Sequence, residues 1–151
     1  NIVLERKDLA ISLKQELDRT YNDLISSKYL INQPPIVIGS KFENPIILNR
    51  NDAGGERGIW DQEEVNGNWK VSIQKGHYNL KFKFLKPLDA NGRMYLEANT
   101  LVRQVQNRTQ GTDMIEMKNV YFTDMDCELT PYYSIGPKNI FPFWVEMEKI
   151  D

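Results

Sequence analysis

The fold of this chain is decided by residues 69–84, WKVSIQKGHYNLKFKF. Large apolar side chains alternate with polar ones, first from Trp69 to Ile73 and then from Tyr78 to Phe84. Such a period of two places one face of a strand inward and the other face toward solvent. Gly76 separates the two runs, at a point where a hairpin turn is expected. The stretch therefore predicts two amphipathic strands joined as a hairpin.

Short strand patterns continue on both sides of this stretch. Residues 36–38 and 46–48 precede it, and residues 94–98, 101–105, 115–122, 129–133 and 143–147 follow it. The dipeptides Asn66-Gly67 and Asn91-Gly92 are typical of tight turns. About nine short strands at close spacing, with no helical pattern between them, indicate an antiparallel sandwich. We predict a mainly β fold, a jelly-roll-like antiparallel β-sandwich over residues 34–151.

Residues 1–30 predict one amphipathic helix before the sandwich. Its apolar positions recur every three to four residues, and Asp8 is a candidate N-cap; they are Leu9, Leu13, Leu17, Tyr21 and Leu24. Pro34 and Pro35 end the helical pattern, so residues 1–33 form a helix with its linker. The apolar stripe has to be covered by the sandwich, by a missing upstream domain or by a second copy in a homodimer. Because the chain begins with Asn1, we expect it to be a piece of a longer protein.

Composition excludes several classes of protein. The 151 residues are 40% hydrophobic and 26% charged, which is typical of a soluble globular domain. The net charge of −2 provides no basic excess, so a nucleic-acid partner is not expected. No apolar run approaches the roughly 18 residues that span a bilayer, and no signal peptide is recognised. With one cysteine, Cys127, and one histidine, His77, the chain can form neither an internal disulfide nor a His/Cys zinc site.

The loop between residues 49 and 60 is the first candidate site. It gathers charged and amide side chains around three glycines and ends in an aromatic residue; the candidates are Arg50, Asn51, Asp52, Arg57 and Trp60. Arginine forks suit sulfate, phosphate or carboxylate groups, and glycine lets a backbone approach a ligand. We expect these side chains to face a substrate or a domain interface. The alternative is a solvated connecting loop whose charges pair with each other, and Trp60 packed in the core.

Two further patterns each have a simpler explanation. Acidic residues cluster after residue 112 and could offer oxygen ligands to Ca²⁺, although a solvated acidic turn is the default; they are Asp113, Glu116, Asp124, Asp126 and Glu128. Asn107-Arg108-Thr109 fits the acceptor pattern for N-glycosylation, a pattern that often occurs by chance. We expect Cys127 to be a small core residue and His77 to lie at the surface.

An ordered series of elements resembles the C-terminal end of bacterial arylsulfatases, particularly the long Bacteroides-type members. The series runs from the helix around Leu13 to Tyr21 through PPIVIG at 34–39, ENP at 43–45 and LNRNDAGGERGIW at 48–60. It continues through the Trp69-x-Val71 and Gly76-x-Tyr78 strands to DMIEM at 113–117 and PFWVE at 142–146. No single element is diagnostic, but the order covers nearly the whole chain. Phe42 is a departure, because a histidine is expected there in relatives.

This resemblance implies a parent enzyme that hydrolyses sulfate esters, with a sulfated glycan as its substrate class. The chemistry would come from a calcium ion and a formylglycine in an upstream catalytic domain of the same chain. The formylglycine motif, Cys/Ser-x-Pro-x-Arg, does not occur in these 151 residues, and Cys127 is followed by Glu128-Leu129. The resemblance therefore predicts a non-catalytic domain without cofactors, inactive alone, in a periplasmic or extracellular protein. A stand-alone carbohydrate-binding jelly roll is the alternative, and a purely structural sandwich in an adhesion or assembly protein is a third.

Overall fold

A computed structural model of the chain describes residues 5–89 and 91–151. The chain divides into two compact units between Pro34 and Pro35. The first unit contains two helices, α1 (Lys7–Ile25) and α2 (Lys28–Ile31). They are separate because the Ser27 side chain accepts a hydrogen bond from the Tyr29 amide and begins a new helix. The single predicted helix over 1–30 is therefore interrupted, and residues 1–4 lie outside the described residues. Asp8 lies in the first turn of α1, while Arg6 occupies the N-cap position that was expected for it.

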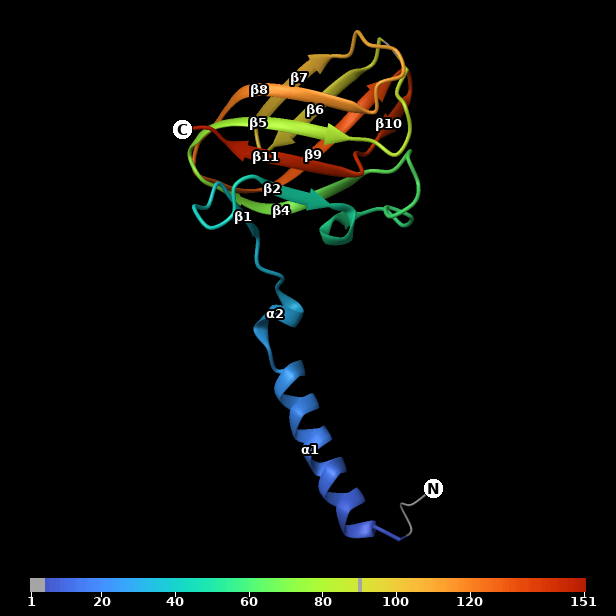
Figure 1. Cartoon of the computed structure of the whole chain (residues 1–151), viewed down its shortest axis with the longest axis vertical. Coiled ribbons are helices and arrows are strands. Elements are labelled where there is room, and N and C mark those ends of the chain that lie inside the picture. Colours follow the sequence, from blue (N-terminus) through green and yellow to red (C-terminus); the bar gives the residue numbers. More distant parts are fainter. Residues whose placement is uncertain (1–4, 90) are drawn as a thin grey trace. The chain divides into compact units, whose positions relative to one another are not determined.

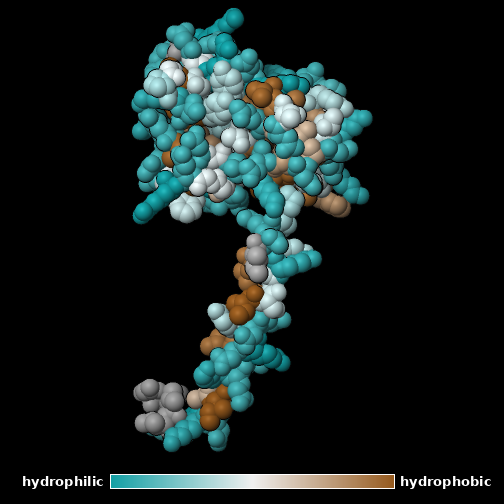
Figure 2. All heavy atoms as spheres, turned by 180° about the vertical axis from the view of Figure 1, so that it is seen from behind, coloured by the Kyte–Doolittle hydropathy of each residue, from teal (hydrophilic) through white to brown (hydrophobic). Residues whose placement is uncertain are grey.

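Helix α1 is amphipathic, yet none of its residues is buried. Figure 2 shows the apolar side chains along this helix as brown spheres. The exposed large apolar residues of α1 are Leu9, Ile11, Leu13, Leu17, Tyr21, Leu24 and Ile25. Short ion pairs, Lys14 with Asp18 and Arg19 with Glu16, lie elsewhere on the same helix. No helix in the described part of the chain is long and apolar enough to cross a membrane.

The second unit is a β-sandwich of two sheets (Figure 1). The larger sheet has the order β1-β4-β9-β6-β7, with β10 paired to β9 and β3 to β4. Its strands are β1 (Ile36–Ile38), β3 (Gly54–Gly55), β4 (Gly67–Ile73), β6 (Arg93–Ala98), β7 (Leu101–Gln106), β9 (Met125–Ile135) and β10 (Lys138–Ile140). The smaller sheet has the order β2-β11-β5-β8. It contains β2 (Ile46–Asn49), β5 (Gly76–Lys83), β8 (Met114–Phe122) and β11 (Trp144–Lys149). All pairings are antiparallel except that of β1 with β4, so the predicted antiparallel β-sandwich with one N-terminal helical segment is confirmed.

The hairpin predicted for residues 69–84 is wrong, although both of its strands are present. Strand β4 pairs with β1 and β9, whereas β5 pairs with β11 and β8 in the opposite sheet. The alternating pattern defines the buried face of each strand, but it cannot define the partner strand. Gly76 begins β5 after the chain has crossed from one sheet to the other.

The core between the sheets is built by the inward side chains that the alternation predicts. Trp69, Val71, Tyr78, Leu80 and Phe82 are completely buried. Aromatic contacts join elements that are distant in the sequence, as in the Tyr78 and Phe122 rings, which meet edge to face at 5.6 Å between centroids. Cys127 is buried as expected, and this burial raises the pKa of its thiol.

The two expected tight turns have different outcomes. Asn91 has a left-handed φ of 74° and forms a turn before β6, as predicted. Gly67, by contrast, is the first residue of β4, and the Glu56 amide donates to the Asn66 carbonyl oxygen next to the short β3–β4 ladder. The Asn66-Gly67 dipeptide therefore enters a strand rather than turning the chain. A Cβ at Gly67 would meet the Ile59 and Phe141 side chains, which explains the glycine by close packing.

Candidate functional site

The predicted site loop is organised around Arg50, which begins a short 3-10 turn, Arg50–Asp52. The guanidinium donates to the carbonyl oxygens of Ile59 at 2.8 Å and of Gln62 at 2.6 Å, both in the segment between β3 and β4. It also donates to the carbonyl oxygens of Phe141 at 2.5 Å and Pro142 at 3.1 Å. Four main-chain acceptors from two distant segments therefore converge on one side chain. Arg50 ties the loop to the segment before β11.

The guanidinium of Arg50 is consequently not available to a ligand. Arg50 is only 2% exposed, and its burial lowers the pKa of the guanidinium, an effect opposed by Glu63 and Asp61. The group lies 5.7 Å from the centre of the Phe141 ring, and that ring stacks on Trp69. The Trp69 indole in turn donates to the carbonyl oxygen of Asn49 at 2.7 Å. The expectation that Arg50 faces a substrate is corrected, because its fork is satisfied inside the protein.

The other four predicted residues of the loop are at the surface. The Asn49 side chain accepts from the amide of Asn51 and donates to the carboxylate of Asp52, which fixes the start of the turn. Arg57 is exposed and makes no hydrogen bond or ion pair with any residue that the structure describes. Trp60 is 64% exposed rather than packed in the core. Asn51, Asp52, Arg57 and Trp60 can therefore meet a partner or a ligand, and their role stays a prediction.

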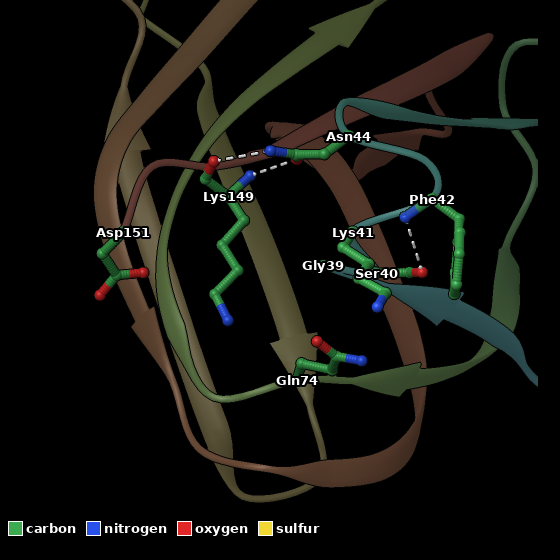
Figure 3. Close-up of a pocket in the computed structure, with 8 residues that line it drawn as sticks. All are labelled: Gly39, Ser40, Lys41, Phe42, Asn44, Gln74, Lys149 and Asp151. Atoms are coloured by element: carbon green, nitrogen blue, oxygen red, sulfur yellow. Dashed lines mark hydrogen bonds between the residues drawn. The ribbon is translucent and has the colours of Figure 1, made fainter.

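A second candidate site was not predicted as one. The turn after β1 and the end of β11 enclose an open hollow of about 570 Å³ (Figure 3). It is lined by Gly39, Ser40, Lys41, Phe42, Asn44, Gln74, Lys149 and Asp151. In Figure 3 the Lys149 and Lys41 side chains extend toward the side-chain amide of Gln74. The hollow thus combines two ammonium groups, one carboxylate, amide and hydroxyl groups and one aromatic ring.

One wall of this hollow is held by hydrogen bonds from a side chain to the main chain. The Asn44 side chain donates to the Lys149 carbonyl oxygen at 2.9 Å and accepts from the Lys149 amide at 2.8 Å. It therefore continues the pairing of β2 with β11 beyond Ile46, between residues 105 positions apart in the sequence. Gly39 has a φ of 85°, and a Cβ there would overlap the hydroxyl of Tyr78. Only glycine lets the backbone pass this close to the tyrosine while in a left-handed conformation.

Phe42 lies at the tip of this turn and is 88% exposed. Its amide donates to the Ser40 hydroxyl at 3.2 Å, and the Lys41 ammonium lies 5.1 Å from the centre of its ring. In the described residues, no carboxylate forms an ion pair with Lys41 or Lys149 within 4.0 Å. The sequence shows an aromatic residue between charged neighbours at this turn. That pattern would have indicated a binding site only if the turn had been known to border a hollow.

Asp151 closes one side of the hollow and belongs to a pair with His77. One carboxylate oxygen accepts from the His77 amide at 2.8 Å, and the other lies 2.9 Å from the imidazole Nδ1. Hydrogen bonds from the His77 side chain, then from its amide, lower the pKa of Asp151. The His77 ring also lies against Tyr121 at 5.1 Å. His77 is at the surface, as predicted, and it holds the carboxylate at the rim.

The remaining sequence candidates have structural partners. Asn107, the expected sugar acceptor of the glycosylation pattern, is buried, and its amide nitrogen donates to the Asp89 carbonyl oxygen and the Tyr133 hydroxyl. Of the acidic residues considered for Ca²⁺, Asp113 pairs with Lys83 and Asp124 accepts from the Lys75 amide. Within residues 5–89 and 91–151, no three His, Cys, Asp or Glu residues are grouped as metal ligands. The calcium alternative has no support from this geometry.

Comparison with known proteins identifies no family. No protein-family model matches the chain, and no curated protein matches it closely enough to count as a relative.

Proposed function

We propose that this chain is the non-catalytic C-terminal part of an arylsulfatase-type enzyme that hydrolyses sulfate esters on glycans. The observation that carries the proposal is helix α1, with seven large apolar side chains exposed and none buried. Each fully buried leucine or isoleucine would contribute about 1.5–3 kcal/mol, so a stable partner surface for this stripe is strongly favoured. The proposed partner is an upstream catalytic domain of the same chain.

The residues that carry the arylsulfatase resemblance support an accessory role. Gly39 permits close approach to Tyr78, Asn44 continues the pairing of β2 with β11, and Arg50 ties the 50–62 loop to residues 141–142. These are contacts that build a scaffold, and they need no reacting group. The sulfate-ester chemistry, with its calcium ion and formylglycine, belongs in this proposal to the preceding domain. The parent enzyme would act in the periplasm or outside the cell.

Sequencing the coding region upstream of Asn1 is the first test. We expect a Cys/Ser-x-Pro-x-Arg motif several hundred residues earlier, and turnover of a generic aryl sulfate by the full-length protein. The 151-residue chain alone is expected to give no turnover with the same substrate. An upstream region without the motif would overturn the proposal, as would a full-length protein that never hydrolyses a sulfate ester.

Within this proposal, the exposed half of the 50–60 loop faces the substrate cleft or the domain interface. Alanine replacements at Asp52, Arg57 and Trp60 in the full-length enzyme are expected to lower turnover or stability. A matched control is Lys70→Ala, an exposed position on β4. If the three loop variants retain full turnover and unfold at the same temperature as the control, the loop has neither role.

A stand-alone carbohydrate-binding module is the second candidate. The specific observation in its favour is that two aromatic rings, Phe42 and Trp60, are largely exposed on the sandwich. Phe143 and Tyr121 are exposed to a smaller degree, Trp69 is buried, and Tyr95 and Tyr132 stack on each other at 5.0 Å. In such a module α1 would be covered by a second copy. Glycan binding by a dimer, with no sulfatase motif upstream, would favour this candidate.

A further inference from the structure

We propose that the hollow between the turn at residues 39–44 and the end of β11 binds an anionic saccharide. The ammonium groups of Lys41 and Lys149 would hold a sulfate or carboxylate substituent, and the Phe42 ring would lie against the sugar ring. The choice of sulfate rests on the proposed function. The affinity of the hollow for an anionic sugar rests on the geometry alone.

The first argument is electrostatic. Lys41 and Lys149 both line the hollow, and neither is neutralised by an ion pair within 4.0 Å among residues 5–89 and 91–151. Among the described residues that line the hollow, Asp151 is the one carboxylate. Its oxygens accept hydrogen bonds from His77, which lower its pKa most, and the nearby charge of Lys149 lowers that pKa further, so Asp151 offsets part of the Lys149 charge. Two ammonium groups in one hollow attract an oxyanion, and charge-assisted hydrogen bonds to it are stronger than neutral ones. The side chain of Gln74 adds both a donor and an acceptor for hydroxyl groups.

The second argument concerns Phe42. A phenylalanine that is 88% exposed keeps most of its apolar surface in water, which is unfavourable unless something covers it. The face of an aromatic ring carries negative charge density and attracts the weakly positive C–H groups of a sugar ring. The Lys41 ammonium lies 5.1 Å from the centre of the same ring. Lys41 can therefore bind an anionic substituent while the neighbouring Phe42 contacts the face of the sugar ring.

The third argument is that the frame is fixed before any ligand arrives. Asn44 is bound to the backbone of Lys149 by two hydrogen bonds, and the Ser40 hydroxyl accepts from the Phe42 amide. The hydroxyl of Tyr78 donates to the Gln74 carbonyl oxygen at 2.7 Å, which holds the base of the hollow. A preorganised site loses less entropy on binding than a mobile turn would.

A protein partner suits this surface less well. Of the described residues that line the hollow, Phe42 alone has a large apolar side chain, and the other side chains are polar or charged. Protein interfaces usually have an apolar centre of several side chains, whereas a sugar offers hydroxyl groups around one modest apolar face. The balance of one ring, two ammonium groups, two side-chain amides, one hydroxyl and one carboxylate therefore favours a saccharide.

The test is a titration of the uniformly ¹⁵N-labelled 151-residue chain, monitored by amide chemical shifts. The probes are a short dextran sulfate oligosaccharide, unsulfated dextran of the same length, and inorganic sulfate. We expect the sulfated sugar to shift the amides of Lys41, Phe42, Gln74 and Lys149 and to bind more tightly than either of the other probes. Replacing Lys41 or Lys149 by glutamine should weaken binding by about three- to tenfold each. Phe42→Ala should weaken it to a similar degree.

Lys70→Gln is the matched control, because Lys70 is exposed on β4 and does not line the hollow. Equal weakening by the control would mean diffuse attraction of a polyanion, and would overturn the site. Equal binding of unsulfated dextran, or of inorganic sulfate alone, would overturn the anionic-saccharide assignment. No shift at these amides would overturn it as well. If binding fails while the upstream region encodes an active sulfatase, only this inference falls. Binding without any sulfatase motif upstream would instead reject the proposed function.

Discussion

The guanidinium of Arg50 donates to the Phe141 carbonyl oxygen at 2.5 Å and lies 5.7 Å from the centre of the same residue's ring. One residue thus receives both a hydrogen bond and a cation–π contact from a side chain 91 positions away. This relationship closes the sandwich at one end, because Arg50 follows β2 and Phe141 precedes β11. It also converts a charged loop residue into part of the core.

Replacing Arg50 by alanine should be strongly destabilising. The change leaves the carbonyl oxygens of Ile59, Gln62, Phe141 and Pro142 without this donor, and we expect a loss of about 3–5 kcal/mol in the free energy of unfolding. Urea denaturation of the 151-residue chain measures it. Arg57→Ala removes the same charge from an exposed side chain and should change stability by less than about 0.5 kcal/mol. Equal midpoints for the two variants would contradict the anchoring role.

Gly39→Ala tests the close passage of the backbone over Tyr78. The new Cβ would overlap the tyrosine hydroxyl, in addition to the cost of a φ of 85°. We expect a loss of about 2–4 kcal/mol, in the range of overpacking plus left-handed strain. Gly111→Ala is the control, because its φ is 75° and nothing lies within 4 Å of its Cβ. Thermal unfolding of both variants separates the steric cost from the backbone cost, and Gly111→Ala should lose only about 1 kcal/mol.

Asn44→Ala should loosen the wall of the hollow. The variant loses both hydrogen bonds to the backbone of Lys149, and we expect a cost of about 1–2 kcal/mol. Amide hydrogen exchange at Lys149 should quicken, because its protected N–H loses its acceptor. Asn139→Ala, at an exposed position on β10, should leave that exchange unchanged. If hydrogen exchange at the Lys149 amide is unchanged in Asn44→Ala, the two hydrogen bonds from the Asn44 side chain do not hold this wall of the hollow.

The interaction of His77 with Asp151 should make the stability of the folded protein depend on pH in a defined direction. The pKa of Asp151 is lowered from its usual value of 3.8 in the folded protein, chiefly by the hydrogen bond from the His77 side chain. Its contribution to stability is therefore fully present above pH 3.8 and is lost as the pH falls through the lower folded value. Asp151→Asn should be less stable than the native chain at pH 6, and the difference should shrink in acid. If the difference in stability between the native chain and Asp151→Asn grows as the pH falls, the ionised carboxylate of Asp151 does not stabilise the folded protein.

The apolar stripe of α1 can be tested by Leu13→Gln and Leu17→Gln together. In the proposed full-length protein, where α1 would pack on an upstream domain, we expect a loss of about 3–6 kcal/mol in the stability of that packing, from two leucines that are no longer buried. In the 151-residue chain the unfolding of the sandwich should be unchanged, and sedimentation velocity should show less self-association. Gln15→Ala is the control on the polar side. If the full-length double variant is as stable as the native full-length protein, the stripe is not a docking surface.

The sequence by itself determined which faces of the strands are buried. The alternation from Trp69 to Phe84 is a local property of the chain, and a period of two admits only one inward face. It also determined the helix before Pro34 and the mainly β class, because both follow from periodicity and from proline and glycine positions. The surface placement of His77 and the buried Cys127 follow from residue type.

Tertiary structure alone decided which strands pair and where the polar groups go. Strands β4 and β5 are neighbours in sequence but lie in opposite sheets, since pairing depends on long-range packing that the alternation does not encode. For the same reason Arg50, polar by type, is buried among four carbonyl groups, of which those of Phe141 and Pro142 are remote from it in sequence. The hollow beside Phe42 exists only because Asn44 and Lys149 meet across 105 positions, and no local pattern could have brought them together.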